Sequence, residues 1–306
     1  MSFMPPFSFG YPNYLEPPVF RPPSEAGSLI LQATLGCSHN RCTFCGSYRT
    51  KQFKVKPFPQ FREEVEELAR TQRIRPKRIF IADGDAFVLS ASQLLEILTL
   101  LTKEFPDVER ISIYASGTNV LRKTDEELTQ IREAGLDMVY IGLESGDDEV
   151  LQLVNKSISN EDHITACLRL KKAGYTVSPI IILGVGGKSR SHQHATQTAA
   201  TIRAIDPPYL AALTLMLVPG TELHAQAQRG EFQPLDPLET LEELRTIMDG
   251  LTDLTHCVFR TNHASNYLPL RGILSQDRQQ LLDAIDTVLN DPQAANKLRP
   301  EYIRGL

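Results

Sequence analysis

Long apolar runs, long basic runs and a paired set of cysteines are all missing from this chain of 306 residues. Without a stretch of about 18 apolar residues, we expect no transmembrane helix. The first residues lack a charged segment followed by an apolar one, so we expect no secretory signal. Five cysteines, an odd number with three clustered, do not make a disulfide framework. We therefore expect a protein of the reducing cytoplasm.

The charge of the chain also excludes classes of partner. The formal net charge is −5 and no long basic run occurs, so nothing indicates non-specific binding to nucleic acid. We expect neither DNA nor a membrane as a partner. Hydrophobic residues make up 42% of the chain, which is ordinary for a globular protein and predicts a sizeable core.

Three cysteines fall within nine residues, at Cys37, Cys42 and Cys45, with the spacing C-x4-C-x2-C. Thiolates are soft ligands that suit iron–sulfur clusters, zinc or copper(I). A [4Fe–4S] cluster held by three cysteines leaves one iron open. The three thiols, with the aromatic Phe44 before the last of them, favour this interpretation. Structural zinc takes four ligands, and His39 could supply the fourth, so a zinc site is the alternative.

Short apolar segments alternate with amphipathic ones along most of the chain. The predicted strands are residues 28–34, 78–82, 110–115, 138–143, 177–183 and 210–217. The predicted helices between and after them are residues 61–73, 92–105, 125–134, 147–155, 161–173 and 191–204. Such alternation predicts βα units and a parallel sheet. Six units are fewer than the eight of a full barrel, so the predicted fold is α/β, a partial (β/α)6 TIM-like barrel.

Three regions are expected. Residues 1–27 are rich in proline and aromatics, which excludes a helix or a central strand. We expect an extended arm packed on the domain surface, with a substrate lid as the alternative. Residues 28–230 form the barrel core. Residues 231–306 form an α-rich C-terminal extension over the barrel mouth, with helices at 240–250 and 277–289 and a short strand at 258–260.

Polar and glycine-rich residues follow every predicted strand, where parallel α/β sheets place their chemistry. After the cysteine loop, these turns contain Asp83-Gly84-Asp85, Ser116, Glu144, Gly184 to Gly187, and Pro219-Gly220. Each turn alone has an ordinary interpretation as a tight connection. Their gathering at one edge of the sheet predicts the functional site there.

The cysteine loop resembles that of the radical S-adenosylmethionine (radical SAM) superfamily, whose common form is C-x3-C-x2-C with an aromatic before the last cysteine. This chain has one residue more in the first gap. The resemblance covers roughly residues 28–230 and is nearest to the oxygen-independent coproporphyrinogen oxidase, methylthiotransferase and Elp3-like branch. It implies a partial barrel, a [4Fe–4S] cluster on Cys37, Cys42 and Cys45, and S-adenosylmethionine (SAM) as cofactor.

The resemblance also implies cofactor contacts beyond the cysteines. The turn Asp83-Gly84-Asp85 matches the position that receives the ammonium group of SAM. Glu144 matches the ribose contact. Lys156 stands where an arginine usually pairs with the SAM carboxylate, and lysine offers no bidentate fork.

Further cofactor contacts are expected around the adenine. Phe44 and the backbone of Gly184 and Gly186 match adenine contacts, and Ser116 joins the expected cofactor set. The branch has an acidic residue in the fifth strand. This chain has only isoleucines at 180–182, so that contact is not expected here.

By the same resemblance, reductive cleavage of SAM gives methionine and a 5′-deoxyadenosyl radical that abstracts hydrogen from substrate. An external one-electron donor of the flavodoxin or ferredoxin type and a small-molecule substrate are expected. The expected substrate contacts lie in the polar segment 259–270 and are Arg260, His263, Asn266 and Tyr267. The alternative for that segment is a loop whose Asn and Ser side chains satisfy its own backbone.

Two other classes of function are compatible with the cysteine loop. One is a non-catalytic zinc or iron–sulfur protein that uses Cys37, Cys42, Cys45 and His39 as ligands. The other is a metal-independent α/β enzyme with Cys45 as nucleophile. Cys167 and Cys257 are predicted to be buried and inert.

Overall fold

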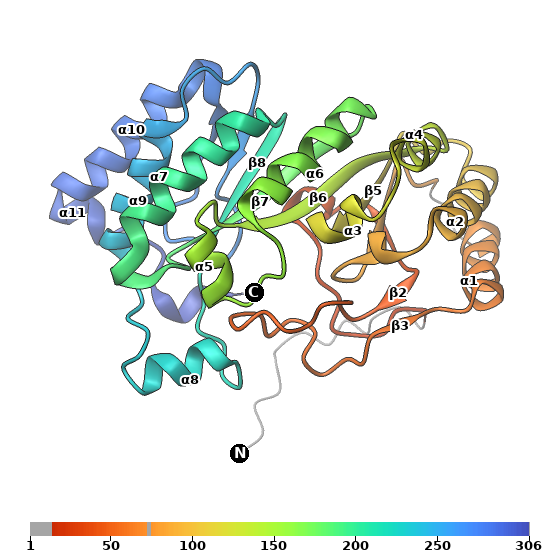
Figure 1. Cartoon of the computed structure of the whole chain (residues 1–306), viewed down its shortest axis with the longest axis horizontal. Helices are drawn as coiled ribbons and strands as arrows, with labels where there is room; N and C mark the ends of the chain where they lie inside the picture. Colours follow the sequence, from red (N-terminus) through yellow and green to blue (C-terminus); the bar gives the residue numbers. More distant parts are fainter. Residues whose placement is uncertain (1–13, 72–74, 306) are drawn as a thin grey trace.

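The computed structural model describes residues 14–71 and 75–305, which form one curved sheet with helices on its outer side (Figure 1). The sheet has the strand order β1-β4-β5-β6-β7-β8-β9-β10. All neighbours from β1 to β9 are parallel, and β10 is antiparallel to β9. The strands are β1 (Leu29–Gln32), β4 (Arg78–Ala82), β5 (Arg110–Ala115), β6 (Leu136–Glu144), β7 (Thr176–Leu183), β8 (Tyr209–Thr214), β9 (Val258–Arg260) and β10 (Arg271–Ile273).

The outer helices form two groups along the curved sheet. Helices α1, α2 and α4 lie near one end of it, and α7, α9 and α10 lie near the other (Figure 1). The helices are α1 (Phe58–Thr71), α2 (Ala91–Glu104), α3 (Gly117–Leu121), α4 (Asp125–Glu133), α5 (Asp148–Leu153), α6 (Asn160–Lys172), α7 (Gly187–Ile205), α8 (Glu222–Gln228), α9 (Pro237–Gly250), α10 (Leu274–Asn290) and α11 (Pro292–Ala295). Ser90, Thr124 and Asp236 begin α2, α4 and α9 through capping boxes, which satisfy the first amide groups of each helix.

The mostly parallel sheet agrees with the predicted α/β barrel, and the strands at 78–82 and 110–115 have the predicted bounds. The region beyond residue 230 differs from the expectation. It is helical in part, but β9 pairs in parallel with β8, with Tyr209 opposite Val258, and β10 extends the sheet further. The C-terminal extension is therefore continuous with the barrel wall.

The inner and outer faces of the sheet have different surroundings. The outer face packs on the helices through a large apolar core. The inner face carries a smaller cluster of Phe80, Ala82, Met138 and Tyr140. The rings of Phe80 and Tyr114 meet edge to face with centroids 5.0 Å apart. An aromatic interior with room beside it leaves the barrel able to hold a ligand.

The described part of the N-terminal arm lies against the inside of the barrel. Glu25 is fully buried, accepting from Arg110 Nη2 at 2.7 Å and from the Tyr140 hydroxyl at 2.6 Å. Farther along the arm, Glu16 N donates to Gln32 Oε1 at 2.7 Å, and Gln32 Nε2 donates to Glu16 O at 3.1 Å. Residues 19–24 and 26 of the arm line a cavity, which the expectation of an arm packed on the domain surface did not include. Residues 1–13 of the arm lie outside the described residues.

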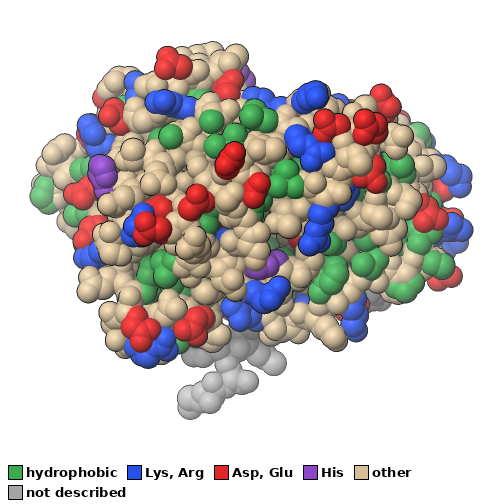
Figure 2. Space-filling view, viewed as in Figure 1, with side chains coloured by type: hydrophobic (Ala, Val, Ile, Leu, Met, Phe, Trp, Pro, Cys, Tyr) green, Lys and Arg blue, Asp and Glu red, His purple; other side chains and the backbone are tan. Residues whose placement is uncertain are grey.

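Charged side chains are mixed over the face shown in Figure 2, where lysine and arginine alternate with aspartate and glutamate. No basic stripe of the kind that follows a nucleic-acid backbone is visible among the described residues on that face. Among the described helices, none has the length and apolarity that crossing a membrane requires.

Candidate active site

A cavity of about 570 Å³ lies at the carboxyl ends of the strands, and the three clustered cysteines line it. We call it the cysteine cavity. Its other walls come from the ends of β5 and β6, from Ile180 and Ile182 of β7, and from the segment after α5. The residues that line it include Cys37, Ser38, Cys42, Phe44, Cys45, Tyr48, Gly84, Asp85, Tyr114, Ser116, Asn119, Arg122, Gly142, Glu144 and Lys156.

Hydrogen bonds from distant segments hold the cysteine loop in shape. The loop runs between the two strands of a small ribbon, β2 (Thr34–Leu35) and β3 (Lys54–Val55). Thr43 N donates to Val154 O at 3.0 Å, and Arg49 donates to the carbonyl oxygens of Cys42 and Cys45 at 3.0 Å each. The positions of the thiols are therefore set by backbone contacts on both sides.

The two carboxylates of the Asp83-Gly84-Asp85 turn also hold this loop. Asp83 is fully buried, accepts from Gly36 N and Lys51 Nζ at 2.8 Å each, and does not line the cavity. Asp85 lines it, but accepts from Ser38 Oγ at 2.6 Å. Asp83 therefore stands apart from its expected contact with a cofactor ammonium group, because its oxygens are used inside the protein.

Asp85 joins three segments around the cavity. Besides Ser38, it accepts from Ser116 N at 3.0 Å and from Asn119 Nδ2 at 2.5 Å. Ser116 is the N-cap of α3, so the same residue ends β5 and begins the helix. Burial raises the pKa of the Asp85 carboxyl above its usual range, and the hydrogen bonds oppose this shift. Ser116 lies at the cavity as predicted, with its amide and hydroxyl directed to Asp85.

Gly84 lets the turn approach the cysteine loop closely. A Cβ at this position would lie 2.7 Å from Cε2 of Tyr48 and 3.0 Å from Cβ of Cys37. Real Cβ atoms do not approach so closely, so a side chain here would displace the Tyr48 ring. Glycine therefore leaves the backbone of the turn open to the cavity.

Glu144 and Lys156 form an ion pair in the cavity wall. Lys156 Nζ lies 2.8 Å from Glu144 Oε1, and the two side chains are 13% and 11% exposed. Glu144 has φ +64° and follows an irregularity in the pairing of β6 with β7, which turns its side chain inward. Gly142 lies beneath the pair, where a Cβ would collide with the carboxylate. Burial alone would lower the pKa of Lys156, but Glu144 and Cys42 hold it above its usual value.

Phe44 faces the apolar side of the cavity, where it packs on Val150, Val154 and Ile182. The expected adenine turn lies elsewhere. Gly184 and Gly186 do not line the cavity, since Gly184 donates its amide to Glu243 at 2.6 Å and lies against Leu235. The wall of β7 is apolar, as the sequence indicates.

The donor set is three thiols that line one cavity, which fits a [4Fe–4S] cluster with one open iron, whereas structural zinc takes four ligands. His39, the proposed fourth zinc ligand, instead has Nε2 2.7 Å from the carbonyl of Asn155. Burial raises the pKa of the Cys42 thiol to about 11, so ligation must displace its proton.

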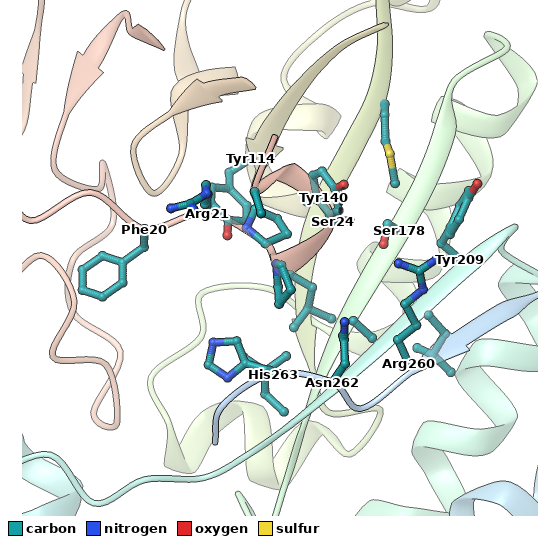
Figure 3. A pocket seen from close by; sticks show the side chains of 18 of the residues that line it. Phe20, Arg21, Ser24, Tyr114, Tyr140, Ser178, Tyr209, Arg260, Asn262 and His263 are labelled. Atoms are coloured by element: carbon teal, nitrogen blue, oxygen red, sulfur yellow. Dashed lines mark hydrogen bonds between the residues drawn. The ribbon is translucent and has the colours of Figure 1, made fainter. Parts of the chain in front are cut away.

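A second cavity, of about 550 Å³, lies inside the barrel next to the first. We call it the arginine cavity, after Arg21, Arg78, Arg110 and Arg260 in its walls. Figure 3 labels two of them, Arg21 and Arg260. Arg260 and His263, two of the four expected substrate contacts, line this cavity and not the cysteine cavity.

Asn266 and Tyr267, the other two expected substrate contacts, line neither of these cavities. Asn266 is buried and bonds to Thr214 Oγ1 and to the carbonyl of Ala212 at 2.9 Å each. Tyr267 donates to Glu301 Oε2 at 3.0 Å. Asn266 therefore ties the loop after β9 to β8 and to its own backbone at Thr261, as in the alternative interpretation of that segment, and Tyr267 ties the loop to the C-terminal segment.

Several residues at the cysteine cavity carried no predicted role. Ser38 and Asn119 hold Asp85, and Arg122 donates to Asn119 Oδ1 at 3.1 Å. Asn119 stands in the polar turn after the third predicted strand, which was the available signal. Cys167 and Cys257 are fully buried and line neither cavity, and burial raises the pKa of each thiol to about 12.

Comparison with known proteins connects this geometry to a family. Residues 31–199 match the family described as the radical SAM superfamily. The heme chaperone HemW of Bacillus subtilis (strain 168) is 24% identical over 219 residues, which cover 69% of this chain and 56% of HemW. The tRNA uridine(34) acetyltransferase of Methanocaldococcus infernus is 23% identical over 70% of this chain and 47% of its own length. The chain thus spans about half the length of these relatives.

A solved structure extends the likeness to the fold. Coproporphyrinogen III oxidase (HemN) from Escherichia coli superposes with a TM-score of 0.57 at 18% identity, covering 75% of this chain and 53% of HemN. At this level of identity the likeness concerns the fold alone.

Proposed function

Because the chain belongs to the radical SAM superfamily, which matches residues 31–199, we propose that it cleaves SAM reductively to methionine and a 5′-deoxyadenosyl radical that abstracts hydrogen from a small-molecule substrate. The chain is an enzyme, and the enzymes of this family use a [4Fe–4S] cluster and SAM. Radical chemistry of this kind is supplied by the cofactors, whereas the protein binds and orients them.

One observation carries the proposal. The three thiols and the Glu144–Lys156 pair line the same cavity, so soft metal ligands and a charged pair face one volume. In our assignment Cys37, Cys42 and Cys45 hold three irons of the cluster. We infer that an external one-electron donor of the flavodoxin or ferredoxin type supplies the electron.

The charged pair has the capacity to bind both ends of SAM. An ammonium group has three donors, so Lys156 can keep its bond to Glu144 and still pair with the SAM carboxylate. Glu144 has a second oxygen that can accept from ribose hydroxyls, as acids do at dinucleotide riboses. Phe44, with the apolar groups beside it, offers a face for the adenine. Gly84 offers backbone to the SAM ammonium in place of the two aspartates.

The test is anaerobic purification and cluster reconstitution, followed by dithionite and SAM, with 5′-deoxyadenosine measured by chromatography. We expect 5′-deoxyadenosine from the parent protein and none from Cys42→Ala. Cys167→Ala is the control, because Cys167 lies in the core of α6 and lines neither cavity, and it should retain formation of 5′-deoxyadenosine. Four bound irons without 5′-deoxyadenosine would indicate a structural cluster, and zinc without iron would overturn the proposal.

A further inference from the structure

The arginine cavity lies beside the cysteine cavity. The two share five wall residues, Phe20, Ser47, Tyr114, Ile180 and Leu213. A molecule in the arginine cavity therefore lies next to the volume assigned to the cofactor. Its capacity of about 550 Å³ is within the range of about 300–1,000 Å³ that small-molecule sites occupy.

The walls of this cavity are cationic, although the chain as a whole carries a net charge of −5. Among the described residues, four arginines and His263 line it, and no Asp or Glu does. Arg110 is neutralised by Glu25 at 2.7 Å, and Arg78 donates to the carbonyl of Ser24 at 3.4 Å. A backbone carbonyl does not neutralise Arg78, so the excess positive charge resides on Arg78, Arg21 and Arg260, and only the side chains of the last two lack a hydrogen-bond partner among the described residues.

The side chains of Arg21 and Arg260 have no hydrogen bond or ion pair with any described residue. They come from different parts of the wall, Arg21 from the arm and Arg260 from the end of β9. Arg21 lies beside Tyr114, and the Arg260 side chain extends toward Tyr209 and Ser178 (Figure 3). A guanidinium group that faces a cavity without a carboxylate partner is suited to bind an anion of the ligand, with two parallel hydrogen bonds.

The rest of the wall is apolar or aromatic. Tyr114, Tyr140 and Tyr209 lie on neighbouring strands together with Met138 and Ile180. Rings on the inner face of a barrel present flat surfaces that bury a ligand's carbon skeleton at little cost in side-chain entropy. The cavity thus combines an apolar body with charged ends.

We propose that the arginine cavity is the substrate site and that the substrate is a small molecule with an apolar or aromatic body and a carboxylate or phosphate group, held by Arg260 and Arg21. This proposal rests on the proposed function, because it takes the ligand of the arginine cavity to be the substrate of that reaction. It gives the arm a role in specificity, because Phe20 and Arg21 belong to both the arm and the cavity wall.

Binding of three matched probes tests this assignment without any radical chemistry. The probes are 1-naphthoate, 1-naphthyl phosphate and neutral 1-naphthalenemethanol, measured by calorimetry on the reconstituted full-length protein. We expect at least one anionic probe to bind about tenfold or more tightly than the alcohol, which corresponds to about 1.4 kcal/mol. The tighter of the two anions identifies the group as carboxylate or phosphate.

Three variants locate that binding. Arg260→Met should weaken the anionic probe about tenfold, Arg260→Lys should lose much less, and Arg203→Met is the control because Arg203 is exposed on α7 and outside the cavity. Arg260 is exposed and unpaired in the described structure, so its loss should not unfold the protein. Anionic probes that bind no better than the alcohol, or equally well to Arg260→Met, would overturn the inference. Formation of 5′-deoxyadenosine without substrate tests the proposed function separately.

Discussion

His163 gives a quantitative prediction about stability behind the cysteine cavity. Its side chain is fully buried on α6, and neither ring nitrogen has a hydrogen-bond partner among the described residues. It faces Gly117 of α3, where a Cβ would come within 3.1 Å of Nδ1. Burial lowers the pKa of His163 to about 3, with the charge of Lys156 adding to the effect. The folded state therefore keeps this imidazole neutral, whereas the unfolded chain protonates it near pH 6.5.

The sign and size of the effect follow from this difference. Because folding lowers the pKa of this base, the contribution of His163 to the unfolding free energy is fully present above pH 6.5. It is lost as the pH falls below 6.5 and the unfolded chain takes up a proton. At pH 5, which is about 1.5 units below the unfolded pKa, protonation of this imidazole stabilises the unfolded state by about 2 kcal/mol. This figure depends little on the folded value, since about 3 is already far below 5.

The perturbation is His163→Leu, measured by urea unfolding of reconstituted protein at pH 7.5 and pH 5.0. We expect the stability of the variant relative to the parent to improve by about 2 kcal/mol between the two pH values. A constant packing cost of leucine cancels in this comparison. His192→Leu, at an exposed position of α7, should show no such change. A difference that stays the same at both pH values would refute the argument.

Two further predictions concern the cysteine cavity. Gly84→Ala places a Cβ 2.7 Å from the Tyr48 ring and should cost about 1–3 kcal/mol in unfolding free energy and reduce retained iron, whereas Gly305→Ala, with nothing within 4 Å, should change neither. Unchanged iron content and stability in Gly84→Ala would show that the ring moves freely. Lys156→Met leaves Glu144 without its partner and should weaken SAM binding about tenfold or more in equilibrium dialysis. Lys156→Arg keeps the charge and should bind SAM nearly as well as the parent, and equal affinity in Lys156→Met would remove Lys156 from the site.

The strong strands could be predicted from the sequence because their apolar runs are bounded by turn residues. Residues 78–82 and 110–115 are examples, and both have the predicted bounds. The ribbon strands β2 and β3 have two residues each, and α3 has five. All three are too short to show a periodic pattern of apolar residues. The three-residue strand β10 was missed and the pairing of β9 was not foreseen for the same reason.

At the site, the sequence located the residues better than it located their contacts. Because Asp85 and Glu144 follow predicted strands, they were expected at the carboxyl ends of the strands, and both line the cavity there. It did not reveal that the Asp83 carboxylate points back to Gly36 and Lys51, because the direction of a side chain depends on the local turn. The cavity behind the arm was not foreseen, because proline content indicates an extended chain but not what that chain packs against.

The partners of the cysteine loop have a consequence for how the protein is made. The loop is held by Asp83 and Asp85, by the carbonyl of Val154, and by Leu223, whose amide donates to Thr43 O at 2.9 Å. During synthesis the thiols leave the ribosome long before Leu223 does, since chains emerge from the N-terminus at about 5–20 residues per second. For that interval the loop lacks the contacts that fix its shape. We therefore expect a cluster to be held firmly only after α8 has been synthesised, and a nascent chain stalled before Leu223 should take up a cluster poorly.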